Sequence, residues 1–252
     1  PAVLDVSTRV HVDAALAELT EVRGVPFGNA LHKLLELHQP GQRFRDATAD
    51  VQSALARHAV RIDGRTPLPV IAQRVATMLD RALDAPLVLH PGAPPLRLGE
   101  LPVAARRAEV AFHFVLRDAS LSTLRTACAA HGEPDLVPPG SAERLAGWME
   151  GSIDLVLEHA GRAHVLDWKS NALAHADATL PAALEATMDA SHYRFQALLY
   201  TVALHRLLRQ RLGLRYRIAE HLGAPVYVFL RAAGLAPAHG LGVWSRRFPD
   251  AL

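Results

Sequence analysis

The sequence predicts a mixed α/β fold, with a small mixed β-sheet flanked by helices and a helical N-terminal part. Three observations predict it. Apolar residues recur at helical spacing through the first third of the chain. Two β-rich segments within 151–170 are joined by a turn, and a long helical pattern at 191–212 precedes a short apolar strand. This order of helices and strands is typical of one α/β domain.

The helices of the first third are predicted where apolar residues recur every three or four positions. These segments are 13–22, 28–38 and 69–83. A proline-rich loop at 91–95 follows, and the alternation over 108–117 then predicts a strand. Residues 121–132 are predicted to form a helix that ends at Gly132, and the apolar run 224–232 predicts the last strand.

Length and composition limit the class of protein. The chain has 252 residues, half of them hydrophobic, which is enough for a sizeable core. No apolar run approaches the ~18 residues of a membrane span, and no signal peptide opens the sequence. The single cysteine, Cys128, excludes a disulfide framework, a four-thiolate iron–sulfur cluster and a Cys-rich zinc site. We therefore expect a cytoplasmic location without membrane partners, and Cys128 as a small buried residue.

The strongest local pattern is a β-hairpin. Its two strands are GSIDLVLE (151–158) and AHVLDWKS (163–170). If the turn is symmetric about Ala160 and Gly161, Asp154 and Asp167 face each other with Cβ atoms about 4.5–5.5 Å apart. Lys169 lies two residues beyond Asp167 and then points to the same face. A loop of odd length would instead place the two aspartates on opposite faces.

Two carboxylates at this separation repel each other unless a cation lies between them. Mg²⁺ is typically held by one or two carboxylates, and a neighbouring ammonium can stabilise charge that builds up on phosphorus. The alternative is a surface hairpin with an ordinary ion pair on its solvated face. The otherwise apolar strands argue against it, because charges embedded in such strands need a partner.

Lysine and asparagine are scarce in this chain. Of the 27 basic residues, 25 are arginine, and the two lysines are Lys33 and Lys169. The two asparagines, Asn29 and Asn171, lie close to them in the sequence. Almost all basic residues of this chain are therefore arginines. Lys169 is an exception, and it lies beside the two aspartates of the hairpin, where an ammonium could stabilise charge on a phosphoryl group.

These motifs together resemble the PD-(D/E)XK nuclease superfamily, in its RecB-type branch, the C-terminal nuclease domain of the exodeoxyribonuclease V beta subunit. Five ordered elements between about residues 24 and 248 carry the resemblance, which is weakest over 40–105. They are Gly28 and His32 in G-x-x-x-H, Glu109 before the first strand's apolar run, Asp154 with the V-L-D-W-K-S-N run at 165–171, Gln196 and Tyr200 in Q-x-x-x-Y, and the segments 225–232 and 242–244.

The resemblance implies a restriction-endonuclease-like fold and a single nuclease domain over 1–252. Within it, 1–105 is the mostly helical part carrying His32, and 106–248 is the catalytic α/β core. The implied Mg²⁺ ligands, with Mn²⁺ as a substitute, are His32, Asp154, Asp167 and the backbone carbonyl of Trp168. The implied catalytic residues are Asp154, Asp167, Lys169, Gln196 and Tyr200. Glu109 is expected in the outer shell of the metal, and Tyr193 and Arg194 are expected to contact DNA.

The residues alone leave other interpretations open. His32 on an apolar helix is also compatible with a buried structural histidine, and Glu109 with a solvated charge at a strand edge. Gln196 and Tyr200 share one helix face, which is also compatible with a buried face that has polar tips. The range 190–219 contains six arginines and no acidic residue. That strip suits a nucleic-acid backbone, a solvated helix face or a protein interface.

The resemblance also implies a function and partners. It implies a Mg-dependent deoxyribonuclease acting on single-stranded DNA, as the nuclease module of a RecBCD-like helicase–nuclease in recombinational repair and DNA end processing. Its partners would be DNA, a helicase motor in the full-length protein, and RecC-like and RecD-like subunits. This chain has no Walker-type ATP site. Two alternatives are a catalytically silent DNA-binding or scaffold domain with a nuclease fold, and a nuclease directed at RNA or another phosphodiester.

Overall fold

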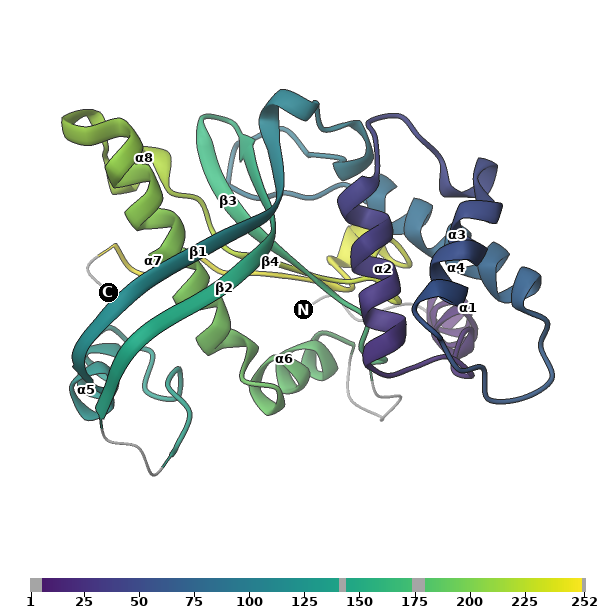
Figure 1. Cartoon of the computed structure of the whole chain (residues 1–252), viewed down its shortest axis with the longest axis horizontal. Coiled ribbons are helices and arrows are strands. Elements are labelled where there is room, and N and C mark those ends of the chain that lie inside the picture. The colour runs from purple at the N-terminus through teal and green to yellow at the C-terminus, as the bar shows by residue number, and fades with distance from the viewer. Residues whose placement is uncertain (1–5, 141–143, 174–179, 251–252) are drawn as a thin grey trace.

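The computed structural model describes residues 6–140, 144–173 and 180–250 (Figure 1). The helices in this part are α1 (Val6–Ala17), α2 (Val25–Leu37), α3 (Thr48–Arg57), α4 (Leu68–Asp84), α5 (Leu121–Ala130), α6 (Leu180–Ala190), α7 (Tyr193–Leu212) and the short α8 (Ile218–His221). The strands are β1 (Arg106–Ser120), β2 (Arg144–His159), β3 (Arg162–Lys169), β4 (Val226–Phe229) and β5 (Val243–Ser245). None of the described helices is long and apolar enough to cross a membrane.

The strands form one mixed sheet in the order β1-β2-β3-β4-β5. Neighbouring strands are antiparallel except β3 and β4, which are parallel. The parallel pair needs a long crossover, and α6, α7 and α8 lie in the chain between its two strands. The predicted mixed α/β fold is confirmed.

The hairpin between β2 and β3 has the predicted register. Ala160 and Gly161 both have positive φ, 49° and 77°, as a two-residue type I′ turn requires. His159 pairs with Arg162 at the turn, and the ladder continues to Leu155 and Leu166. The next positions in this register are Asp154 and Asp167, so the regular pairing stops one step before the two aspartates.

The structure corrects the sequence prediction in several elements. Strands β1 and β2 are longer than predicted, and beyond β3 they form a two-stranded ribbon that crosses α7 and ends near α5 (Figure 1). Helix α1 ends at Ala17, earlier than predicted, and a turn follows in which Leu19 has φ 60°. Helix α6 and strand β5 were not predicted as elements. Strand β5 is only three residues long and is defined by its pairing with β4, which local periodicity does not encode.

The two faces of the sheet pack against different helices. On one face, buried residues of α2, α3 and α4 form a cluster with Leu155, Leu166 and Trp168. On the other face, Ala197 and Leu198 of α7 pack with Tyr227 and further aromatic residues. Cys128 is buried in this second cluster, as predicted. The site described below therefore lies where α2 and α7 approach the sheet from opposite sides.

A buried arginine ties the N-terminal helices to the sheet. The Arg231 side chain donates hydrogen bonds to the carbonyls of Ser170, Leu19 and Val22. Its guanidinium lies 5.0 Å from the centroid of the Phe27 ring of α2. Because Ser170 follows Lys169 directly, these bonds connect the loop before α2 to the functional end of β3.

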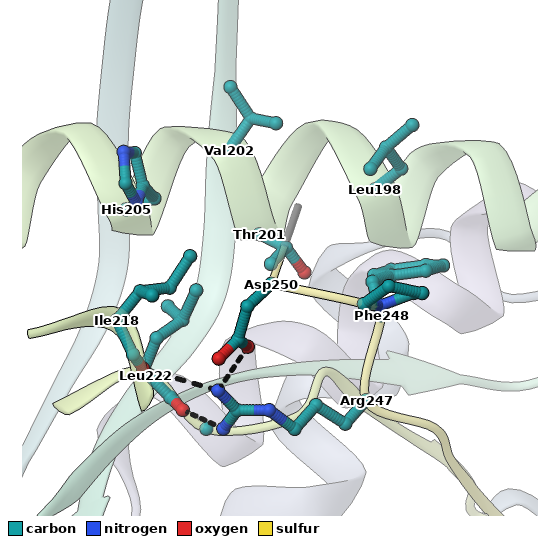
Figure 2. A pocket seen from close by; sticks show the side chains of 11 residues that line it. Leu198, Thr201, Val202, His205, Ile218, Leu222, Arg247, Phe248 and Asp250 are labelled. Atoms are coloured by element: carbon teal, nitrogen blue, oxygen red, sulfur yellow. Dashed lines mark hydrogen bonds and ion pairs between the residues drawn. The ribbon is translucent and has the colours of Figure 1, made fainter. Parts of the chain in front are cut away.

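The far side of α7 encloses a separate cavity of about 190 Å³ (Figure 2). It is bounded by α7, α8 and the C-terminal segment, and Leu198, Val202 and Ile218 give it a largely apolar lining. Arg247 holds the C-terminal segment against α8 by donating to the carbonyls of Leu222 and Ile218. This cavity lies on the helix face opposite to Gln196 and Tyr200.

Candidate active site

Three strands place acidic residues in one row. The pairs Ala108–Leu155 and Val110–Ile153 put Glu109 opposite Asp154 across β1 and β2. The hairpin register puts Asp167 next to Asp154 on the other side. Glu109 has a positive φ of 49°, an uncommon conformation for a non-glycine residue in a strand. Backbone strain of this kind often accompanies a functional site.

His32 reaches this row from α2. Its Nδ1 lies 3.3 Å from Asp154 Oδ1, and its Nε2 lies 3.1 Å from the carbonyl oxygen of Trp168. Burial lowers the pKa of His32, but the carboxylates of Asp154 and Asp167 outweigh that effect, so the net pKa is raised. An oxygen acceptor beside each ring nitrogen favours the protonated imidazolium. The ring therefore occupies a position that favours positive charge.

Gly28 accounts for the close approach of α2 to β3. A Cβ atom at this position would lie 3.3 Å from the Ser170 hydroxyl oxygen, tighter than normal packing. The G-x-x-x-H spacing thus has a physical basis: glycine lets the helix approach the strand, and one turn later His32 reaches the carboxylates.

His32, Glu109 and Asp154 form a cluster of three possible metal ligands, one imidazole and two carboxylates. One nitrogen or oxygen of each lies within 4.8 Å of the others. The backbone N–H of Trp168 donates to Asp154 Oδ2 at 2.8 Å, and the hydroxyl of Ser152 donates to Glu109 Oε2 at 2.8 Å. These bonds fix both carboxylates. The sequence predicted Glu109 in the outer shell of the metal. In the structure its carboxylate lies within 4.8 Å of ligand atoms of His32 and Asp154, which is close enough for all three to bind one ion.

Asp167 is the most deeply buried acid of the group. Its pKa is raised to about 6, chiefly by burial and also by the nearby Asp154 carboxylate, although the Lys169 ammonium lowers it. The Nζ atom of Lys169 lies 2.6 Å from Asp167 Oδ2. That oxygen is fully buried and has no further hydrogen-bond partner in the described part of the chain, so its charge is balanced chiefly by the ammonium.

Lys169 lies in a narrow, aromatic slot. Its ammonium donates to Gln196 Oε1 at 3.0 Å and lies 3.9 Å from the ring centroid of Tyr193 and 5.2 Å from that of Tyr227. Only 11% of its side chain is exposed. A compact ammonium fits between two rings and a carboxylate, whereas a planar guanidinium is wider. This explains why lysine occupies this position in an arginine-rich chain.

Tyr227 is a member of the site that sequence reasoning missed. It is fully buried on β4, where the parallel register pairs it with Asp167. Its hydroxyl donates to Gln196 Oε1 at 3.2 Å, and Gln196 Nε2 donates to the Tyr200 hydroxyl at 3.0 Å. Gln196 Oε1 thus accepts from both Tyr227 and Lys169, which fixes the orientation of the amide. The only sequence signal was a polar ring within an otherwise apolar strand.

The two residues predicted to contact DNA have different surroundings. The hydroxyl of Tyr193 donates to Asn171 Oδ1 at 3.1 Å, and its ring packs on Lys169. Arg194 forms ion pairs with Glu185 and Asp189. Its charge is therefore already neutralised by α6, which weakens the prediction that it contacts DNA.

The second lysine has an ordinary environment. Lys33 is exposed and pairs with Glu36 one turn later on α2, at 2.8 Å. The side chain is directed along the helix surface and contacts none of the acids of the row in the structure. Lys33 therefore belongs to the solvated face of α2.

The donor set fits a divalent cation. Two carboxylates and one imidazole converge in the cluster of His32, Glu109 and Asp154. Asp167 is not part of that cluster; it lies next to Asp154 in the hairpin register, and its buried Oδ2 lacks a hydrogen-bond donor among the described residues. Carboxylate oxygens suit Mg²⁺ and Mn²⁺, and imidazole is a competent ligand of Mn²⁺. A cation here would also relieve the repulsion within the acidic row.

Comparison with known proteins gives the same family over most of the chain. A family model described as the PD-(D/E)XK nuclease superfamily matches residues 11–237. The RecBCD enzyme subunit RecB of Mycobacterium tuberculosis (strain ATCC 25618 / H37Rv) is 33% identical over 91% of this chain, which covers 23% of that relative. The subunit of the same name from Escherichia coli (strain K12) is 29% identical over 90% of this chain and 19% of the relative. The Mycolicibacterium smegmatis protein is 32% identical over 88% of this chain and 22% of its own length. The chain thus spans about a fifth of the length of these relatives.

Proposed function

Because this chain belongs to the PD-(D/E)XK nuclease superfamily, we propose that it hydrolyses phosphodiester bonds of single-stranded DNA with the help of Mg²⁺. One observation carries the proposal. The Lys169 ammonium is held between Asp167 and Gln196, next to the cluster of His32, Glu109 and Asp154. A group of metal-binding side chains with a buried ammonium beside it suits phosphoryl transfer, because both can stabilise the negative charge of the transition state.

The metal ligands are proposed from this cluster. His32, Asp154 and Asp167 would hold the ion together with the carbonyl of Trp168, and the closeness of Glu109 supports a direct role for this residue as well. A bound Mg²⁺ supplies Lewis-acid polarisation of the phosphodiester. Binding requires His32 to give up its proton, because the neutral imidazole is the ligand.

The remaining polar groups have roles that follow from their hydrogen bonds. Lys169 stabilises negative charge that builds up on the phosphoryl oxygens. Gln196 holds the ammonium in place through its Oε1. Tyr200 accepts a hydrogen bond from Gln196, so its own hydroxyl proton is free to donate to a phosphate oxygen.

The similarity to RecB subunits supports a wider context. We propose that the chain acts as the nuclease module of a RecBCD-like helicase–nuclease in recombinational repair and DNA end processing. Its partners would then be DNA, a helicase motor and RecC-like and RecD-like subunits. DNA reaching this site from a motor would be single-stranded, in keeping with the proposed substrate.

Metal removal tests the proposal. The purified chain should degrade a labelled single-stranded DNA in Mg²⁺ or Mn²⁺, and EDTA should abolish this because the acidic row then lacks its cation. Product formation is followed on denaturing gels, with matched single-stranded RNA and duplex DNA in parallel. Cleavage in EDTA at the rate seen with Mg²⁺ would contradict metal dependence, and preferential cleavage of RNA would contradict the substrate.

A second function is a catalytically silent DNA-binding or scaffold domain. It predicts intact DNA binding with no cleavage in any divalent cation and no metal binding by calorimetry. The presence of the lysine and all the carboxylates at the site supports the enzyme over this alternative.

Tyr227 provides a test of how Lys169 is positioned. We expect Tyr227→Phe to lower kcat about 10-fold with little change in KM, because the Gln196 amide loses one of the two donors that fix its orientation. Steady-state cleavage measures both parameters. Tyr216→Phe removes a hydroxyl that bonds to His205 away from the site and serves as the matched control. An unchanged kcat in Tyr227→Phe would show that Lys169 and Tyr200 fix the amide without Tyr227.

A further inference from the structure

The ribbon formed by β1 and β2 carries an exposed aromatic side chain. The chain has fourteen Phe, Tyr and Trp residues, all in its described part, and Trp148 alone is exposed, at 74%. The other tryptophans, Trp168 and Trp244, are buried. The remaining aromatic residues are buried or half-buried, so Trp148 is the exception, and it lies on a strand.

Trp148 has neighbours that widen its surface. Val115 pairs with it directly across the ribbon and is 43% exposed. The ring of His113 is also exposed, and its centroid lies 6.1 Å from that of the indole, with the two rings tilted by 46°. These three side chains, two rings and one valine, form one small platform with a polar edge.

The platform lies on the face of the ribbon that points away from α7. The opposite face is covered, because Phe112 contacts the Tyr200 ring edge-on at 5.8 Å and Arg206 lies 4.8 Å from the centroid of Phe114. Phe112 and Phe114 alternate along β1 with His113 and Val115, so the two sets point to opposite faces. The ribbon is thus anchored on α7 by one face and open on the other.

The open face leads to the candidate active site. Trp148, Glu150 and Ser152 alternate along β2, so they share this face. Ser152 donates to the carboxylate of Glu109, which belongs to the metal cluster. Ser152 lies four residue steps along the strand from Trp148, a distance of about 13 Å. A strand bound at the site and running along the ribbon would pass over the platform.

We propose that Trp148, with His113 beside it, stacks against an unpaired base of the nucleic-acid strand whose phosphodiester lies in the active site. The proposal rests on the nuclease function proposed above. Stacking on an aromatic ring needs one free face of a base, which a single strand offers and a duplex does not. It is independent of base identity, so the platform would contribute affinity for single strands without sequence preference.

The surroundings of Trp148 favour a base over a protein partner. Stable protein interfaces bury about 800 Å² on each partner around an apolar centre. Among the described residues of this face, the large exposed apolar side chains are Trp148 and Val115, and the next positions toward the site are His113 and Glu150. This is enough for one ring and too little for the centre of a protein interface.

Tryptophan fluorescence provides the test. Since Trp168 and Trp244 are 5% and 4% exposed, quenching by an added oligonucleotide reports mainly on Trp148. With EDTA present, so that strands stay intact, a single-stranded oligonucleotide should quench the signal and a duplex of the same sequence should not. Trp148→Ala should weaken single-strand binding, measured by fluorescence anisotropy, about 5- to 100-fold. Trp148→Phe, which keeps a ring, should stay within about threefold of the original affinity.

Two controls separate stacking from other causes. Leu214→Ala removes another exposed apolar side chain, 96% exposed in the turn that follows α7, and should leave affinity unchanged. A plot of the logarithm of the DNA-binding constant against the logarithm of the salt concentration should have the same slope for Trp148→Ala and the original protein, because stacking releases no counterions. In cleavage assays Trp148→Ala should raise KM for long single strands and leave kcat unchanged.

The outcomes distinguish this inference from the nuclease proposal. Unchanged single-strand affinity in Trp148→Ala overturns the platform, even where Lys169→Ala abolishes cleavage and so supports the nuclease. A chain that cuts no substrate but loses affinity in Trp148→Ala overturns the nuclease and keeps the platform as a binding surface. Loss of subunit assembly in Trp148→Ala, with DNA affinity intact, reassigns this surface to a protein contact and overturns the inference.

Discussion

Lys169→Ala should lower the rate of single-stranded DNA cleavage by about 10²–10³-fold, with DNA affinity nearly unchanged. The ammonium is fixed by Asp167, Gln196 and the ring of Tyr193, so no other cation takes its place. Single-turnover cleavage in Mg²⁺ measures the effect on the chemical step. Lys169→Arg should be almost as defective, because the wider guanidinium does not fit the slot between the two tyrosine rings.

The chain supplies its own control for this experiment. Lys33 is the other lysine, and it pairs with Glu36 on the exposed face of α2. Lys33→Ala should cleave at the original rate, and its melting temperature together with that of Lys169→Ala shows whether each variant is folded. Full activity in a folded Lys169→Ala would remove Lys169 from the mechanism, and an equal loss in both variants would show that general charge, not position, matters.

Asp154→Asn should weaken Mn²⁺ or Mg²⁺ binding by about 100-fold or more and abolish cleavage at ordinary metal concentrations. The amide oxygen still accepts from the Trp168 N–H, so the local fold is kept while the negative charge is lost. Isothermal calorimetry measures the affinity. Asp63→Asn, at an exposed ion pair with Arg23, is the control and should bind metal normally. Unchanged metal affinity in Asp154→Asn would place the ion elsewhere.

Metal affinity should also depend on pH through His32. Asp154 and Asp167 raise the pKa of His32 above its ordinary value despite its burial, so protons compete with the ion. The affinity should therefore fall as pH decreases through this raised pKa, and further as Asp167 takes up a proton near pH 6. In His32→Asn the first of these two steps should be absent from calorimetry between about pH 8 and 6, the range in which histidine titrates. The same pH dependence in both proteins would assign it to another group.

The sequence predicted those parts of the site that local spacing determines. Asp154, Asp167 and Lys169 lie within one hairpin, where turn chemistry sets the register and the period of two sets the face. Gln196 and Tyr200 share a helix face for the same local reason. Their approach to the hairpin, and that of His32, followed only from resemblance to a family, because neither periodicity nor composition encodes which helix packs beside which strand.

The parts that were missed depend on long-range pairing. Tyr227 joins the site through a parallel pairing with Asp167, which lies 60 residues earlier in the sequence. Glu109 comes close to His32 because β1 pairs with β2 across the whole ribbon, and its positive φ has no signature in the sequence. The length of β1 and β2 was also underestimated, since Gly147 and Gly151 interrupt the alternation of β2 that would have revealed it.

Anomalous diffraction from crystals soaked in Mn²⁺ tests the central claim most directly. We predict one strong anomalous peak bounded by His32, Asp154 and Asp167, at about 2.0–2.3 Å from the nearest carboxylate oxygens. The peak should disappear in Asp154→Asn crystals soaked in the same way. A fully soaked crystal with no peak among these residues, or with its only strong peak elsewhere, would contradict the proposed metal-dependent nuclease site.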